Sequence, residues 1–308
     1  MHPVVEALLE KRGVSIEERA AFLSPDFQKG VHDPFLFLRM KVVCERLFLA
    51  MERGERVVIH GDYDADGLCG SALLVSALKT VAQRANWKLF LARLTTYVPS
   101  REGDGYGLSM NAVRQFAGGG VDVIVTVDCG VANVEEIQAA YEAGMEVIVV
   151  DHHQLASTIP ERALIIHPLI PGEMYPFTYL SAVGVAYKVA CALYETARAR
   201  EIAIPKDHEK WLLDLVAIAT VTDMVPLVAE NRVLETFGLL VLAKTRRVGL
   251  QALKTAVGLE GKHITTEDVG FRLGPRLNAP GRLGNADLAL QLLLCENREE
   301  AERLAELL

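Results

Sequence analysis

The chain has 308 residues, 51% of them hydrophobic, and a formal net charge of −8, and this length predicts one large domain or two smaller ones. Its five cysteines form no CxxC pair, which argues against a disulfide framework or a zinc site and favours a reduced, cytoplasmic protein. The first residues lack a basic head before an apolar run, and charges interrupt the long apolar stretches, so we expect neither a signal peptide nor a membrane span.

The N-terminal residues 1–54 are expected to form a helical segment. An apolar pattern over 4–9 and the cap-like start Ser15-Ile-Glu-Glu predict short helices. A longer helix is predicted over 38–53, ending near Gly54.

Short β-branched runs then alternate with helical patterns over residues 55–200. Such runs are typical of strands buried on both faces of a parallel sheet. We therefore predict a doubly wound, mostly parallel α/β sheet here. The strand candidates are 56–59, 121–127 and 146–150, with weaker ones at 88–94 and 164–166, and the helix candidates are 71–81, 109–116 and 134–143.

The rest of the chain is predicted to be helical. Residues 201–295 are interpreted as a helical part of the same domain, and 296–308 as the charged start of a connecting helix. Amphipathic stretches lie at 182–199, 209–221, 231–243 and 285–294.

Acidic and imidazole side chains follow the three best strand candidates. In open α/β sheets ligands bind outside the carboxyl ends of the strands, so these side chains are expected to converge. Each aspartate alone could simply cap a helix. Two carboxylates about 4 Å apart, however, repel by roughly 4 kcal/mol at an effective dielectric near 20, and a cation would relieve this. The side chains are His60, Asp62, Asp64, Asp66, Asp128, Asp151, His152 and His153.

Carboxylates mixed with imidazoles, without cysteine, are ligand chemistry for manganese or magnesium. Bound cations would also neutralise part of the chain's negative charge, so the net charge does not decide against nucleic-acid binding. A fourth acid, Asp223, ends the apolar run 212–221 before Pro226; by itself it could be a turn residue.

These motifs resemble the DHH phosphoesterase family, and within it the exonucleases of RecJ type. The resemblance rests on HGDYDADG at 60–67, TVDCG at 126–130, VVDHH at 149–153 and TVTDMVPL at 220–227, in this order. Further similar stretches lie at 11–25, 104–109, 181–188, 230–232 and 270–284.

The resemblance implies a metal-dependent exonuclease that hydrolyses single-stranded DNA from 5′ to 3′ in DNA repair and recombination. It implies two divalent cations, Mn²⁺ or Mg²⁺, and single-stranded DNA with a 5′ end as substrate, with a single-strand-binding protein or a helicase as further candidate partners. The residues alone leave two alternatives: a phosphodiesterase of short oligonucleotides or cyclic dinucleotides, and a non-catalytic scaffold that binds single strands.

The resemblance also implies roles for individual residues. His60, Asp64 and Asp128 are expected to bind one cation, and Asp66, Asp128, His152 and Asp223 the other, so that Asp128 bridges both. His153 is expected to face the substrate phosphate, which makes His153 and Asp128 the catalytic candidates, while Asp62 and Asp151 orient the ligands.

Five further residues are candidates for contact with the nucleic acid. Arg101 could bind a phosphate through its guanidinium fork. Tyr106 could stack on a base, or simply pack in its loop. Arg276, Asn278 and Arg282 could follow the nucleic-acid backbone, or could hold the helical part to the sheet.

Family members continue into a DHH-associated domain with a Gly-Gly-His motif. That tripeptide does not occur in this sequence. We therefore expect the DHH-associated domain to be absent from this chain.

Overall fold

The structure is a computed structural model that describes residues 1–100, 103 and 105–308. Its centre is a five-stranded, fully parallel sheet with the strand order β2-β1-β3-β4-β5. The strands are β1 (Val57–Gly61), β2 (Leu94–Tyr97), β3 (Val123–Val127), β4 (Glu146–Val150) and β5 (Ala163–Ile166). The predicted α/β fold class is confirmed.

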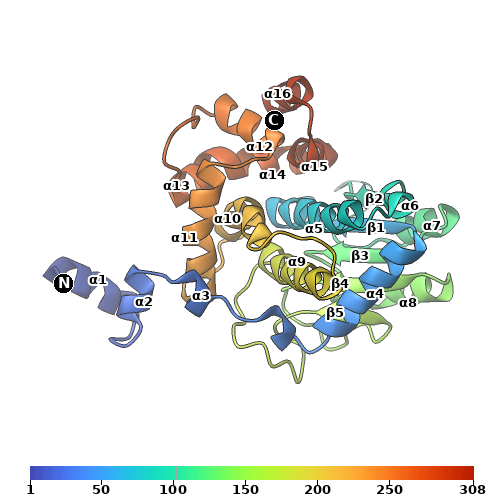
Figure 1. Cartoon of the computed structure of the whole chain (residues 1–308), viewed down its shortest axis with the longest axis horizontal. Coiled ribbons are helices and arrows are strands. Elements are labelled where there is room, and N and C mark those ends of the chain that lie inside the picture. Colours follow the sequence, from blue (N-terminus) through green and yellow to red (C-terminus); the bar gives the residue numbers. More distant parts are fainter. Residues whose placement is uncertain (101–102, 104) are drawn as a thin grey trace.

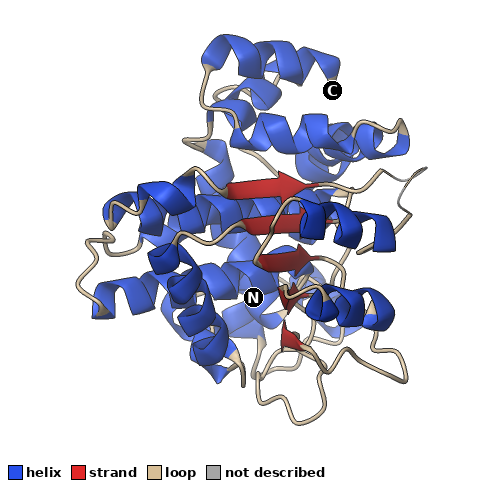
Figure 2. Cartoon of the chain, turned by 90° about the vertical axis from the view of Figure 1, so that its right-hand side faces the viewer, coloured by secondary structure: helices blue, strands red, loops and turns tan. Residues whose placement is uncertain are grey.

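Helices cover both faces of this sheet (Figure 2). Alternate residues of a strand point to opposite faces, so Ile59 and Val125 join the core formed with α4, α5 and α9, whereas Val58 and Ile124 join the core formed with α7 and α8. Burial on both faces explains why these strands are continuous apolar runs. The helices are α4 (Met40–Arg53), α5 (Ala65–Arg84), α7 (Met110–Gly118), α8 (Val134–Glu142) and α9 (Ala182–Ala199).

A second group of helices packs beyond α5 (Figure 1). Within it, α10 contacts α5, α9 and α11, and so joins this group to the sheet layer. The group comprises α10 (Leu213–Thr222), α11 (Ala229–Ala243), α12 (Val248–Ala256), α13 (Thr266–Asp268), the π-helical turn η3 (Val269–Leu273), α14 (Gly274–Arg282), α15 (Ala286–Leu294) and α16 (Arg298–Leu307).

The N-terminal helices extend away from the body toward the N-terminus (Figure 1). They are α1 (Pro3–Lys11), α2 (Arg19–Leu23) and α3 (Phe27–Gly30), and α2 and α3 contact α11. The remaining short elements are η1 (Pro34–Leu36), α6 (Lys88–Leu91) and η2 (His208–Leu212).

The strand predicted at 88–94 is wrong. Lys88–Leu91 form the helical turn α6, whose Phe90 is fully buried, and β2 begins only at Leu94. The true strand pairs with β1 alone and is an edge strand of half-exposed residues, so no continuous apolar run marks it.

The helix after the first acidic motif is longer than the sequence pattern predicts. The helix predicted at 71–81 begins at Ala65, because the Asp64 carboxylate caps it by accepting from the Asp66 and Gly67 amides. Within the part predicted to be helical, the polar run 270–284 forms most of η3 and all of α14.

Among the described residues, α5 alone has the length and hydropathy of a membrane-spanning helix. Its most apolar window is 83% buried inside the protein. Helix α5 also packs against α9, α10 and β1, which is the environment of a core helix.

Candidate metal centre

The first acidic motif lies where β1 runs into α5, and two glycines allow this tight turn. A Cβ on Gly67 would lie 2.5 Å from the backbone nitrogen of Asp62, and a Cβ on Gly61 would lie 2.1 Å from Ser71 Oγ. Side chains at either position would push α5 away from the strand. The start of α5 can therefore sit directly on the carboxyl end of β1.

Asp128 follows β3 in a left-handed backbone conformation, with φ +62°. Its amide donates to Val150 O at the end of β4, at 3.0 Å. A non-glycine residue in this conformation is costly and is found where the surrounding structure demands it. The turn places the Asp128 carboxylate, with a side-chain exposure of only 3%, over the edge of the sheet.

The loop after β4 is organised by Asp151. One carboxylate oxygen, Oδ1, accepts from the His152 amide at 2.7 Å and from His153 Nδ1 at 2.8 Å. The other, Oδ2, accepts from the amide of Val131, in the loop after β3, at 3.1 Å. Asp151 thus fixes the loop of two histidines to the neighbouring loop. The predicted orienting role of Asp151 fits these contacts.

Two helix ends bring the remaining acids to the site. The Asp66 carboxylate accepts from the Ala182 amide at 2.7 Å and from the Val183 amide at 2.8 Å, at the N-terminus of α9, where the helix dipole stabilises negative charge. Asp223 is the C-cap residue directly after α10, and its Oδ2 lies 3.6 Å from His152 Nε2, as does Asp66 Oδ2.

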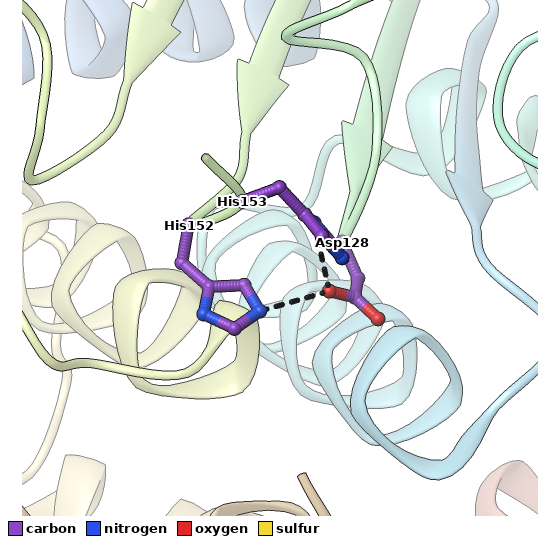
Figure 3. A group of neighbouring side chains, drawn as sticks. All are labelled: Asp128, His152 and His153. Atoms are coloured by element: carbon purple, nitrogen blue, oxygen red, sulfur yellow. Dashed lines mark ion pairs between the residues drawn. The ribbon is translucent and has the colours of Figure 1, made fainter. Parts of the chain in front are cut away.

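These side chains converge on the Nε2 atom of His152. That nitrogen lies 3.3 Å from Asp128 Oδ1, 3.6 Å from Asp66 Oδ2 and 3.6 Å from Asp223 Oδ2. Figure 3 shows that His152 and His153 both approach the same carboxylate oxygen of Asp128, with His153 Nδ1 3.7 Å from Asp128 Oδ1.

Among the residues that the structure describes, three groups of potential ligands share this edge of the sheet. Within each group the ligand atoms lie within 4.8 Å of one another, and Asp128 belongs to two of the groups. The groups are Asp66, His152 and Asp223; Asp62, Asp64 and Asp128; and Asp128, His152 and His153.

The crowding of buried acids makes their ionisation unfavourable. Burial, followed by repulsion from Asp64, raises the pKa of Asp62 to about 7 and that of Asp223 to about 6. Burial and neighbouring carboxylates raise the pKa of Asp66 and Asp128 well above the usual range. Among the side chains with the largest effect on these four pKa values, only His153 acts to lower them, so a bound cation would stabilise the ionised acids.

The histidines differ in their environments. Burial, together with repulsion from His153, lowers the pKa of His152 to about 4, which keeps its ring neutral and able to bind a metal. The hydrogen bond to Asp151 raises the pKa of His153. Burial alone would raise the pKa of Asp151, but its hydrogen bond with His153 and the surrounding amides lower it to about 2.

Buried polar atoms without a hydrogen bond gather at the same point. Within the described part of the chain, no hydrogen bond reaches Asp62 Oδ1, Asp128 Oδ1, Asp223 Oδ2 or His152 Nε2. Such atoms are costly unless something satisfies them. Asp128 Oδ1 and Asp223 Oδ2 face His152 Nε2, and Asp62 shares a ligand group with Asp128. Carboxylate oxygens together with an imidazole nitrogen fit a hard divalent cation, so the residues present fit a manganese or magnesium centre.

His60 and Asp62 lie in surroundings that differ from those expected from the sequence. His60 is fully buried, stacks on Tyr97 and has its Nδ1 3.7 Å from Cys129 Sγ. His60 belongs to none of the three ligand groups found among the described residues, whereas Asp62, expected only to orient ligands, lies in the group with Asp64 and Asp128.

The predicted substrate residues are spread over two elements. Arg101 lies outside the described residues. The Tyr106 hydroxyl donates to Asp128 O at 2.9 Å and lies 3.1 Å from His153 Nε2, so Tyr106 is at the site. Arg276, Asn278 and Arg282 all lie on α14, half-buried to exposed.

Asn278 contacts the protein itself. Its Oδ1 accepts from the Ala65 amide, at the start of α5, at 2.7 Å. Gly281 lies on the same helix, and a Cβ there would meet Tyr63 O at 2.6 Å. Helix α14 therefore packs directly on the loop that carries Asp64.

Sequence reasoning missed the partners that hold the ligands. The α9 amides that bind Asp66, the Tyr106 hydroxyl on Asp128 O and His167, whose Nε2 donates to His153 O at 2.8 Å, were not anticipated. Backbone partners leave no compositional signal, although Ser181 before the apolar run 182–199 could have marked the helix N-terminus.

A parallel α/β sheet with acids and imidazoles gathered at its carboxyl edge defines an α/β protein with a candidate centre for divalent cations. The sequence profile of the DHH family, N-terminal domain, matches residues 56–220. The chain belongs to the DHH family.

Curated relatives are similar over almost the whole chain. The single-stranded-DNA-specific exonuclease RecJ of Bacillus subtilis is 39% identical over 303 residues, covering 98% of this chain and 36% of that protein. Its namesake from Escherichia coli is 39% identical over 310 residues, covering 98% of this chain and 51% of that protein. The chain thus spans about half the length of these relatives or less.

Solved structures agree with this similarity. A crystal structure of exonuclease RecJ bound to manganese superposes with a TM-score of 0.75 at 35% identity, covering 88% of this chain and 64% of that one. RecJ from Thermus thermophilus in complex with Mn²⁺ gives a TM-score of 0.77 at 32% identity, covering 97% of this chain and 40% of that one.

Proposed function

We propose that this chain is the catalytic core of a metal-dependent exonuclease that hydrolyses single-stranded DNA from the 5′ end, in the cytoplasm, in DNA repair and recombination. Support comes from the DHH family match, from relatives named single-stranded-DNA-specific exonuclease and from the cluster of acids and imidazoles. A single-strand-binding protein or a helicase as partner stays an expectation.

We assign two cation positions to the site, with Mn²⁺ preferred and Mg²⁺ as the second candidate, because solved RecJ structures are bound to these ions. Asp66, His152 and Asp223 would hold one ion. Asp64 and Asp128 would hold the other, with Asp62 beside them and His60 as the ligand implied by family resemblance. We assign the bridging role to Asp128 because it belongs to two of the ligand groups.

Divalent cations at such a site polarise a phosphodiester and supply a nucleophile at neutral pH. The chain's own residues bind, orient and donate. His153 is 44% exposed at its side chain and is held by Asp151, so its Nε2, which lies beside the Tyr106 hydroxyl, can donate to a non-bridging phosphate oxygen. Tyr106, whose hydroxyl lies beside His153 Nε2, would line the same substrate position. Arg101, Arg276 and Arg282 remain candidates for phosphate contact.

The observation that carries the proposal is the meeting of three carboxylates around His152 Nε2, where Asp128 Oδ1 and Asp223 Oδ2 have no hydrogen-bond donor among the described residues. If these acids served only as helix caps, their oxygens would accept hydrogen bonds from backbone amides. Of the four ligand acids, Asp64 and Asp66 also accept hydrogen bonds from backbone amides. Asp128 Oδ1 and Asp223 Oδ2 accept no hydrogen bond among the described residues.

The test is hydrolysis of a 5′-phosphorylated single strand, labelled at either end, with Mn²⁺. Wild type is expected to release labelled mononucleotide from the 5′ end first, and chelator or Asp128→Ala to abolish release. Asp287→Ala, which removes an exposed acid on α15, is the matched control and should leave the rate unchanged. If the chain binds Mn²⁺ and DNA but releases nothing, the exonuclease proposal fails for this chain. Cleavage of dinucleotides or cyclic dinucleotides alone would support the short-substrate alternative instead.

A further inference from the structure

Two segments that position the cation ligands meet in a buried polar cluster behind the site. One segment is the start of α9, whose amides hold Asp66. The other is the turn from α10 to α11, which begins at Asp223. We define the buried clamp as Tyr175, Lys188, Glu230 and Asn231.

Asn231 joins the two segments directly. Its side-chain amide, 1% exposed, donates to Tyr179 O, just before α9, at 2.6 Å, and to Pro226 O, just after Asp223, at 3.1 Å. One amide group therefore bridges the chain next to the Asp66 partners and the chain next to Asp223.

The neighbouring Glu230 reinforces this junction with a buried ion pair. Lys188, on α9, pairs with Glu230, at the start of α11, and both side chains are fully buried. Glu230 also accepts from the Tyr175 hydroxyl at 2.7 Å and from the His32 amide at 2.9 Å, while Lys188 donates to His32 O at 2.8 Å. Lys188 and Glu230 thus pair with each other and also have hydrogen-bond partners within the protein, and this network fixes α9 to the start of α11.

The turn between Asp223 and α11 needs such support. Met224, next to Asp223, has φ +61°, and Ala229, at the start of α11, has φ +42°. Left-handed backbone at two non-glycine residues is stable only where surrounding contacts determine it. The Asn231 bond to Pro226 O lies between these two positions.

We propose that Asn231, supported by the rest of the buried clamp, is a positioning residue that sets the spacing between Asp66 and Asp223 and thereby the affinity of the Asp66–His152–Asp223 group for a divalent cation. This inference rests on the proposed cation centre. The clamp contacts neither cation nor substrate; it acts through the backbone of the segments that carry or hold the ligands.

Calorimetric titration of the chain with Mn²⁺ tests the proposal without an activity readout. Asn231→Ala is expected to lower the affinity of one Mn²⁺ site by roughly tenfold, the lower range for residues that orient metal ligands, and to leave the other site unchanged. Thr245→Val is the matched control: the Thr245 hydroxyl is also buried, donates to Asp214 at 2.6 Å and accepts from the Arg247 amide, at the other end of α11. It should lower the melting temperature but leave both affinities within twofold of wild type.

The outcomes separate the two proposals. If wild type binds no Mn²⁺, the cation centre itself fails. If wild type binds two ions and Asp223→Ala loses one, but Asn231→Ala binds both as wild type does, the positioning role is wrong. Should Asn231→Ala not fold by circular dichroism, Tyr175→Phe, which removes one hydroxyl from the clamp, decides: a loss of about threefold at the same site supports the role, and unchanged affinity overturns it.

Discussion

His153 Nδ1 lies 2.8 Å from Asp151 Oδ1, and the same carboxylate oxygen accepts from the His152 amide. One buried acid therefore sets the orientation of both histidines at the edge of the sheet. The ring of His152 faces the acid cluster, while the ring of His153 is turned toward solvent and the Tyr106 hydroxyl.

Replacement of Asp151 by alanine should misplace both rings. We expect the hydrolysis rate to fall at least tenfold, because residues that orient metal ligands and catalytic groups have effects of this size. Steady-state kinetics on a 5′-phosphorylated oligonucleotide measures it. Asp122→Ala, which also removes a carboxylate bonded to a backbone amide, is the control. A rate for Asp151→Ala equal to that of the control would show that Asp151 has no orienting role.

Asp128→Ala should cost more activity than Asp62→Ala. Asp128 belongs to two ligand groups, whereas Asp62 belongs to one. Loss of the shared carboxylate removes a ligand from both cation positions, and loss of Asp62 from one at most. Parallel measurement of rate and Mn²⁺ stoichiometry checks this order. Equal losses would mean that the assignment of Asp128 as the bridging residue is wrong.

The metal-free chain should be more stable with fewer acids at the site. Burial and carboxylate repulsion raise the pKa of Asp128, so an uncharged side chain there relieves the cluster. Asp128→Asn is expected to raise the melting temperature in EDTA by about 3 °C, the effect of roughly 1 kcal/mol in a chain of this size. Differential scanning fluorimetry with and without Mn²⁺ measures both states. The variant should also lose most of the stabilisation that Mn²⁺ gives to wild type; a lower melting temperature in EDTA would contradict the repulsion argument.

Glu235, on α11, provides a pH dependence away from the site. Burial raises the pKa of its carboxyl to about 8, and no hydrogen bond reaches either oxygen within the described residues. Folding raises the pKa, so a protonated Glu235 costs the folded state nothing below about pH 4.5, where the unfolded chain is protonated too. As the pH rises from there toward 8, the free energy of unfolding falls, because only the unfolded chain can release this proton easily.

Glu235→Gln should therefore be more stable than wild type, by on the order of 3 kcal/mol at pH 8 and by little at pH 5. Urea unfolding at the two pH values gives the difference. The comparison between wild type and variant cancels the titration of the cation site, which is common to both. If the difference in unfolding free energy between wild type and variant were the same at both pH values, the pKa of Glu235 would not be raised on folding.

Asn278→Ala should loosen α14 from the start of α5. The lost hydrogen bond to the Ala65 amide leaves a backbone donor beside the Asp64 cap, so we expect about 1 kcal/mol lower stability and weaker Mn²⁺ binding. Asn285→Ala, an exposed residue just beyond α14, serves as the control. If Asn278 acts only on nucleic acid, stability and Mn²⁺ affinity will stay unchanged and only DNA affinity will fall.

Much of the site could be predicted because a parallel sheet brings strand ends together. The β-branched runs located β1, β3 and β4, and sheet topology then places Asp62, Asp128 and His152 at one edge. Asp223 follows a helix, not a strand, and its place in the site came only from the family resemblance.

The sequence could not show contacts made across long separations. Asp66 binds amides 116 residues away, and the Ala65 amide donates to Asn278, 213 residues away. Such contacts depend on how α9 and α14 dock, which no local pattern encodes. The edge strand β2 was missed for a related reason, because half-exposed residues such as Thr95 and Thr96 do not form an apolar run.

The central claim is that the acids at this sheet edge hold a pair of divalent cations, and anomalous diffraction from crystals grown with Mn²⁺ tests it most directly. We predict two manganese peaks, one bound by Asp66, His152 and Asp223 and one by Asp64, with Asp128 between them. Crystals that show no manganese at this edge under saturating Mn²⁺, with the carboxylates bonded only to amides and water, would contradict it.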